Sequence, residues 1–158
     1  MIRGLGDYTK KLCTSAQVGM HADLYAPYGR FKRQIKAERE VWIGAGVGIS
    51  PFISWLQDAD ADDFDKATLV YCFNPGRAFP PPDQLQAMAE LRGAHFVSNP
   101  SGMESIAEVL GQAVANTEPN KVHVSFCGPQ GLLIKVRQLM TSHQIPQQNL
   151  HSELFDFR

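Results

Sequence analysis

The chain has 158 residues, enough for one domain and part of another. Hydrophobic residues make up 44% and charged residues 20%, which is typical of packed globular proteins and excludes a disordered chain. The formal net charge is −1 and no run of Lys or Arg occurs, so composition gives no support to nucleic-acid binding.

The cysteines and histidines show no metal-ligand spacing, so we expect no metal site. Three widely separated cysteines without a CxxC pair indicate a reducing, cytosolic environment. The longest uncharged run, 41–57, is shorter than the roughly 20 residues of a membrane helix and is interrupted by glycines and a proline. No apolar segment typical of a signal peptide follows Met1. We expect the chain itself to be soluble.

The first 31 residues contain too little apolar sequence to bury a core of their own. The pattern predicts a short helix around Lys10–Leu12, a strand over Gly19–Tyr25 and a turn at Ala26–Phe31.

From Arg39 onward, apolar runs alternate with amphipathic segments. This alternation predicts an α/β fold, a doubly wound parallel five-stranded sheet with helices on both faces. The predicted strands are Val41–Ala45, Ala67–Phe73, Ala94–Ser98, Lys121–Cys127 and Leu150–Phe157, and the predicted helices are Pro51–Ala59, Asp83–Leu91, Ser105–Ala115 and Pro129–Ser142.

The turn after the first of these strands is rich in glycine. Gly44, Gly46 and Gly48 alternate and are followed by Ser50 and Pro51, which fits a helix start. A helix start behind glycines can hold a pyrophosphate with its backbone N–H groups. The turn matches neither G-x-G-x-x-G nor a P-loop. Ser50 could donate its hydroxyl to the phosphate, cap the helix, or do both.

Ligands of doubly wound sheets bind at the carboxyl ends of the strands. We therefore expect the glycine turn, Asn74–Arg77, Ser98-Asn99 and Cys127-Gly128-Pro129 to share one sheet edge.

Five motifs in family order resemble the ferredoxin–NADP reductase superfamily: GDYT, PYGRF, VWIGAGVGISPF, SFCGP and the terminal ELFDFR. The likeness is closest to the reductase portion of bacterial ferric-reductase-like, NADPH-oxidase-like transmembrane proteins. It implies that residues 1–35 are the C-terminal remnant of an FAD-binding barrel with its linker, and that residues 36–158 are an NAD(P)-binding domain. The family motif R-x-Y-[ST] is absent and Ala26 replaces a usual glycine, so the chain resembles a fragment that lacks most of its FAD site.

The resemblance also implies roles for individual residues. Gly6 and Thr9 would meet the FAD pyrophosphate. Cys127, followed by Gly128 and Pro129, would lie beside the reactive nicotinamide carbon. The Glu153-Leu154-Phe155 segment would supply an acidic residue and an aromatic ring that covers the flavin, with Phe157 as a second candidate for that ring. From residue chemistry alone, Cys127 could equally be a buried structural thiol, and the terminal aromatics could be core residues of an edge strand.

The choice between NADH and NADPH depends on a pocket for the 2′-phosphate. Arg77 could bind that phosphate. NADPH enzymes of the superfamily often have Ser-Arg after the third strand, where this chain has Ser98-Asn99, and the acidic residue of NADH enzymes is also missing. The sequence leaves the choice open.

The predicted function is NAD(P)H binding in a flavin oxidoreductase that passes electrons through FAD to haem, ferric iron or oxygen. The resemblance implies a transmembrane haem partner and a position on the cytoplasmic side of the inner membrane. One alternative is the reductase component of a soluble oxygenase or of a flavohaemoglobin-like protein. Another, from a different class, is a non-catalytic nucleotide sensor, since a fold alone does not establish activity.

Overall fold

The computed structural model describes residues 6–23, 31–61, 64–100 and 104–154, and the chain divides into two compact units, Met1–Arg30 and Phe31–Arg158. In the first unit the predicted helix forms as α1, Asp7–Ser15. The strand predicted over Gly19–Tyr25 is wrong for its described part, because residues 19–23 contain no strand. An isolated extended segment needs a partner strand for its backbone groups, and an alternating pattern does not supply one.

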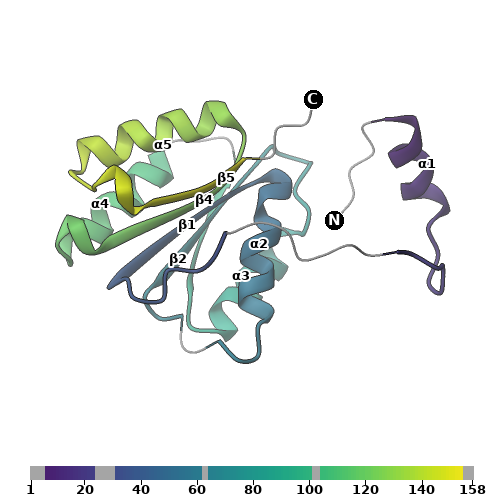
Figure 1. Cartoon of the computed structure of the whole chain (residues 1–158), viewed down its shortest axis with the longest axis horizontal. Helices are drawn as coiled ribbons and strands as arrows, with labels where there is room; N and C mark the ends of the chain where they lie inside the picture. The colour runs from purple at the N-terminus through teal and green to yellow at the C-terminus, as the bar shows by residue number, and fades with distance from the viewer. Residues whose placement is uncertain (1–5, 24–30, 62–63, 101–103, 155–158) are drawn as a thin grey trace. The chain divides into compact units, whose positions relative to one another are not determined.

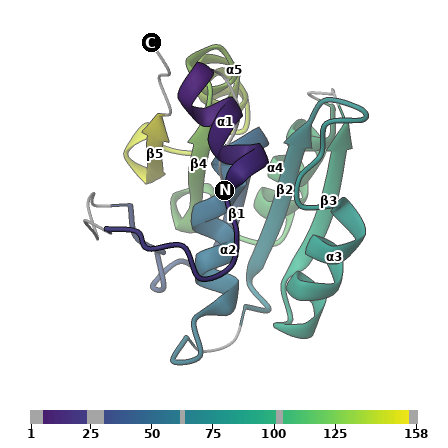
Figure 2. The ribbon, with the colours of Figure 1, turned by 90° about the vertical axis from the view of Figure 1, so that its right-hand side faces the viewer.

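The second unit contains a five-stranded parallel sheet with the order β3-β2-β1-β4-β5, which confirms the predicted fold. Figure 2 shows these strands side by side, with β5 and β3 at the two edges. The strands are β1 (Arg39–Ala45), β2 (Ala67–Phe73), β3 (His95–Pro100), β4 (Val122–Gly128) and β5 (Leu150–Leu154). The end predicted for the last strand, residues 155–157, lies outside the described residues.

Helices cover both faces of the sheet, α2 and α3 on one and α4 and α5 on the other (Figure 1). They are α2 (Ser50–Gln57), α3 (Pro82–Leu91), α4 (Glu104–Ala115) and α5 (Gln130–Ser142). Within the residues that the structure describes, three 3₁₀ turns join the elements: η1 (Gly46–Ile49), η2 (Pro119–Lys121) and η3 (Gln147–Asn149). None of the helices in the described ranges is long and apolar enough to cross a bilayer.

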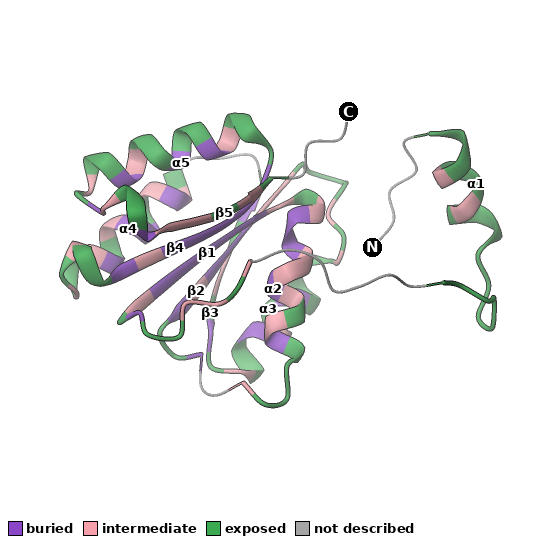
Figure 3. Ribbon diagram, viewed as in Figure 1, coloured by how far each residue is buried: buried purple, intermediate pink, exposed green. Residues whose placement is uncertain are grey.

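The alternation of side chains along the strands builds two cores. Val41 and Ile43 of β1 pack towards α4 and α5, while Trp42 packs towards α2, with Phe52 and Phe64 around it. Because central parallel strands are covered on both faces, most residues of β1, β2 and β4 are buried. Figure 3 shows the burial along the central strands, with exposed residues on the outer faces of the helices.

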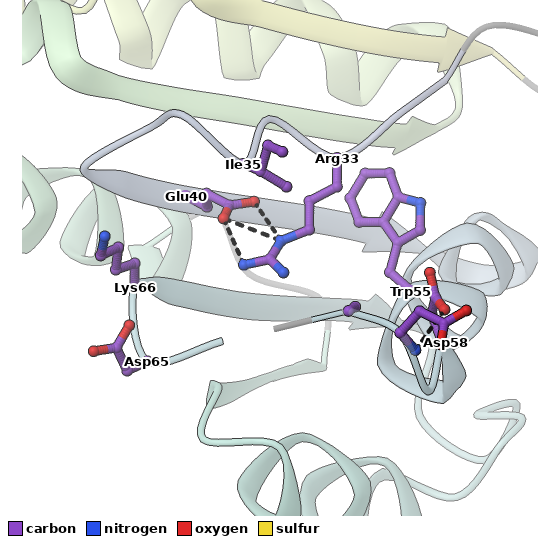
Figure 4. Close-up of a pocket in the computed structure, with 9 residues that line it drawn as sticks. Arg33, Ile35, Glu40, Trp55, Asp58, Asp65 and Lys66 are labelled. Carbon is purple, nitrogen blue, oxygen red and sulfur yellow. Dashed lines mark hydrogen bonds and ion pairs between the residues drawn. The ribbon is translucent and has the colours of Figure 1, made fainter. Parts of the chain in front are cut away.

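A buried ion pair fixes the segment before β1. The Arg33 guanidinium donates to the Glu40 carboxylate from Nε at 3.1 and 3.2 Å and from Nη2 at 2.9 Å (Figure 4). Glu40 is only 3% exposed and also accepts a hydrogen bond from Trp42 Nε1. Phe31 stacks on Trp55, with 5.2 Å between ring centroids. Phe31 and Arg33 therefore contact residues of the second unit. The predicted boundary after residue 35, between a flavin-domain remnant and the nucleotide-binding domain, stays a prediction.

The same ion pair borders a pocket of about 660 Å³, which Trp55, Asp58 and Lys66 also line (Figure 4). Glu40 and Lys66 lie at the start of β1 and just before β2. This pocket is consequently at the amino ends of the strands, on the edge opposite to the predicted site.

Candidate functional site

One row of residues crosses the whole sheet near the carboxyl ends of the strands. In register order it contains Ser98 of β3, Tyr71 of β2, Gly44 of β1, Cys127 of β4 and Glu153 of β5. Neighbours in register on parallel strands present their side chains to the same face. Four of these five residues were predicted as site residues from the sequence. The register brings them into line, although up to 109 positions separate Gly44 from the others in the chain.

The glycine turn contacts the carboxyl end of β4. A Cβ atom placed on Gly48 would lie 2.2 Å from the Cys127 carbonyl oxygen and 3.1 Å from the Gly128 nitrogen, so no side chain fits there. Gly128 is equally enclosed, since its Cβ would lie 2.8 Å from Ala45 Cβ. The glycine motif and the Cys-Gly-Pro motif therefore form one packed unit.

The other two glycines of the turn have different environments. Gly44 lies under the start of α2, where a Cβ would meet Ile49 and Phe52. Gly46 has φ = +54° and is exposed, and a Cβ on it would touch no other atom within 4 Å. The open space beside Gly46 is where a ligand can approach the backbone of the turn.

The helical start after the turn differs in detail from the prediction. The 3₁₀ turn η1 runs directly into α2, and Pro51 is in the first turn of that helix. The capping alternative for Ser50 is wrong, because Ile49 occupies the cap position. The Ser50 hydroxyl donates to the Val47 carbonyl at 2.9 Å, so in this conformation its proton is engaged inside the turn. The first N–H groups of a helical segment have no acceptor within it and attract anions.

Cys127 is fully buried at the end of β4, beside Glu153. Burial, with the nearby carboxylate of Glu153 as a smaller cause, raises the pKa of the Cys127 thiol to about 12. The group is therefore a neutral thiol at physiological pH and not a nucleophile. Its chemical character is that of a compact, polarizable packing group with one weak hydrogen-bond donor.

The loop after β2 is anchored by a tyrosine. The hydroxyl of buried Tyr71 accepts a hydrogen bond from the Phe79 backbone N–H at 3.0 Å, and burial raises the tyrosine pKa. Within this loop the Arg77 N–H donates to the Asn74 carbonyl at 3.0 Å, closing a turn. Arg77 and Ser98 are both exposed at the carboxyl edge of the sheet. Tyr71 was missed from the sequence because it resembles any other apolar strand residue until the register is known.

The remaining predicted residues are not part of the row. Pro129 is exposed and caps α5 next to Gly128. Gly6 and Thr9 belong to the first unit, where Thr9 Oγ1 accepts from the Gly6 N–H and donates to the Gly6 carbonyl at the start of α1. Phe155 and Phe157 lie outside the described residues. Among those that are described, no group of three or more His, Cys, Asp or Glu residues could hold a metal.

Known proteins resemble this chain over most of its length. No family model matches the chain. It is 30% identical over 149 residues to the ferredoxin reductase component of 3-ketosteroid-9-alpha-monooxygenase from Mycobacterium tuberculosis, covering 91% of this chain and 41% of that protein. It is 27% identical over 139 residues to the carnitine monooxygenase reductase subunit of Escherichia coli, covering 88% and 42%. The chain thus spans less than half the length of these relatives.

A solved structure has a fold similar to that of this chain. The flavohem-like FAD/NAD binding domain of nitric oxide dioxygenase from Vibrio cholerae matches with a TM-score of 0.70 and 21% identity, over 95% of this chain and 65% of that one. Together with the sequence likeness, the match places the chain in the ferredoxin reductase-like NAD(P)/FAD-binding superfamily.

Proposed function

We propose that this chain is the NAD(P)H-binding part of a flavin-dependent oxidoreductase, in which electrons pass from NAD(P)H to FAD. The observation that carries the proposal is the row Ser98–Tyr71–Gly44–Cys127–Glu153 with the glycine turn packed onto its centre. A dinucleotide is an elongated ligand, and this row offers chemically distinct positions along the sheet edge.

The shape of the turn supports a pyrophosphate position. Gly48 packs against β4 while Gly46 leaves its backbone open, and both features need glycine. The N–H groups at the start of η1 would hold the phosphate oxygens, because the Ser50 N–H at the start of α2 already donates to the Val47 carbonyl. A side chain at either glycine would fill or distort this cradle, which is the fit expected for a bound phosphate.

The two ends of the row suggest where the rest of the dinucleotide lies. Arg77 and Ser98, at the β2 and β3 ends, are available for the adenosine moiety and any 2′-phosphate. Cys127 and Glu153 would border the nicotinamide ring, which supplies the hydride when bound. The neutral, compact thiol lets the ring approach β4 without a competing nucleophile. The domain contributes orientation and exclusion of water.

The flavin would be bound chiefly by parts of the protein outside this chain. The Thr9 hydroxyl donates to its own turn, so its proton is engaged in this conformation. We propose FAD as the acceptor because the relatives are named as ferredoxin reductase and oxygenase reductase components. The same names favour an oxygenase partner over the transmembrane haem partner and inner-membrane position predicted from the motifs, which stay predictions.

A calorimetric titration of the chain with NADPH and NADH, with and without FAD, tests the proposal. Gly46→Asp and Gly46→Asn form a matched pair, since both side chains tolerate positive φ and differ only in charge. A carboxylate about 4 Å from a phosphate is repelled by more than ~1 kcal/mol even in polar surroundings. We expect Gly46→Asp to bind at least about fivefold more weakly than Gly46→Asn.

Equal affinities for the two variants would refute the pyrophosphate position. Binding only in the presence of FAD would mean that the flavin completes the site. If neither nucleotide binds under any of these conditions, the chain has the fold but does not bind NAD(P)H. Both the proposed oxidoreductase function and the alternative of a nucleotide sensor would then be refuted.

A further inference from the structure

Two histidines on the last two strands face each other across the sheet. His123 Nδ1 of β4 and His151 Nε2 of β5 are 3.2 Å apart, and the ring planes differ by only 5°. This distance is within hydrogen-bond range. Because a neutral imidazole has one donor and one acceptor nitrogen, one ring donates and the other accepts, and a single proton lies between them.

The pair connects the edge strand β5 to its neighbour β4. β5 is an edge strand with only β4 as its neighbour, and it has five residues. His151 is in register with Ser125, one pleat before the level at which Glu153 meets Cys127. His123, His151, Cys127 and Glu153 therefore alternate onto the same face of these strands. Because His151 and Glu153 are on the same short strand, a contact that restrains His151 also restrains the position of Glu153.

We propose that His123 and His151 are positioning residues, which fix β5 and its Glu153 against Cys127 through the one proton they share. The importance of Glu153 in this statement rests on the proposed function. The hydrogen bond itself does not.

The charged surroundings determine how the pair responds to pH. Burial lowers the pKa of both imidazoles, and a charge on His123 lowers that of His151 further. Glu40 of β1, in register with His123, opposes this shift at His123, but its carboxylate is already paired with Arg33. Glu153, two residues after His151, is the charged group on β5.

Protonating both rings would leave two N–H groups facing each other and place like charges together. Because the folded-state pKa values lie below 6.5, the unfolded chain binds protons more readily. The stabilisation is therefore present above about pH 6.5 and is lost as the pH falls through the lowered pKa values. Acid should loosen β5 selectively.

Hydrogen exchange of this 158-residue chain, expressed as protection factors between pH 5 and 8, tests the inference. We expect His151→Phe, which keeps a ring but loses the hydrogen bond, to lower protection of β5 about fivefold at pH 7.5, as for one neutral hydrogen bond. The acid-dependent loss of protection should disappear in this variant. His151→Gln, which can still hydrogen-bond, should restore part of the protection. His95→Gln, an exposed histidine on the opposite edge strand β3, is the matched control and should change neither property.

Unchanged β5 protection in His151→Phe, or an acid response that persists in it, would overturn the proposed pair. A positioning role also predicts that His151→Phe weakens NADPH or NADH binding but not binding of ADP-ribose, which lacks the nicotinamide. Equal weakening of both ligands, or of neither, would refute the link to Glu153. If no nucleotide binds the wild-type chain, the proposed function fails while the exchange data still decide on the histidine pair.

Discussion

Adding one methyl group to Gly48 is the sharpest perturbation of the site. An alanine Cβ at this position would lie 2.2 Å from the Cys127 carbonyl oxygen, whereas real Cβ atoms essentially never have contacts shorter than 3.0 Å. The glycine turn and β4 would have to separate by about 0.8 Å or more. Forced overpacking of this kind costs about 1–3 kcal/mol of folding free energy.

The same displacement should disturb nucleotide binding more than it disturbs folding. A hydrogen bond from a backbone N–H to a charged phosphate oxygen contributes about 1.5–3 kcal/mol. Losing one such bond weakens binding about tenfold or more. We expect Gly48→Ala to remain folded and to lose at least this much affinity for NADPH and NADH, measured by calorimetry beside urea unfolding.

Gly131 provides the control, because it lies in α5 with no atom within 4 Å of an added Cβ. Gly131→Ala makes the same chemical change only two residues beyond Pro129, in the first turn of α5, and we expect it to leave stability equal to or slightly above that of the wild type. Wild-type affinity in Gly48→Ala would refute the argument that this contact shapes the site. A loss of stability without a loss of affinity would make the turn purely structural.

Three further outcomes follow from the structure. Since its pKa is raised to about 12, Cys127 should be alkylated by iodoacetamide at neutral pH far more slowly than exposed Cys13, as mass spectrometry would show, and equal rates would contradict its burial. Arg33→Ala should lower the free energy of unfolding by about 3 kcal/mol, because it leaves the buried Glu40 carboxylate without its cation. Lys121→Ala, which removes an exposed ion pair, should leave the urea midpoint nearly unchanged. Similar losses of stability in both variants would refute the claim that burial makes the first ion pair the more important one. Arg77→Ala should weaken NADPH binding without affecting NADH binding if the guanidinium binds a 2′-phosphate, and parallel changes in both affinities would make it a surface residue.

The architecture could be predicted from the sequence because the central strands are largely apolar and the helices between them are amphipathic. β1 and β4 are mostly buried, and the helices between the strands carry a single apolar face, so periodicity locates these elements within a few residues. The strand expected over Gly19–Tyr25 failed for residues 19–23 because periodicity does not reveal whether a partner strand exists.

The finer structure of the site depends on lateral register, which no single segment encodes. Tyr71 joins the row only because β1 and β2 pair with Gly44 opposite it. The histidine pair joins residues 28 positions apart, and its spacing along the chain predicts nothing. The cap of α2 also differs from the predicted one. The Ser50 hydroxyl donates to a carbonyl of the preceding 3₁₀ turn, and Ile49 occupies the cap position.

The contact between Gly48 and β4 has a consequence for how the molecule can adapt to a ligand. In a dinucleotide, rotatable single bonds connect the phosphates to the reactive ring, so the distance between them varies within limits. Since the turn bears directly on the Cys127 carbonyl, these two parts of the sheet edge cannot slide past each other or close up independently. The backbone therefore fixes the spacing between the turn and the end of β4, and a nucleotide bound at both places, as proposed, would have to match that spacing through its own torsion angles.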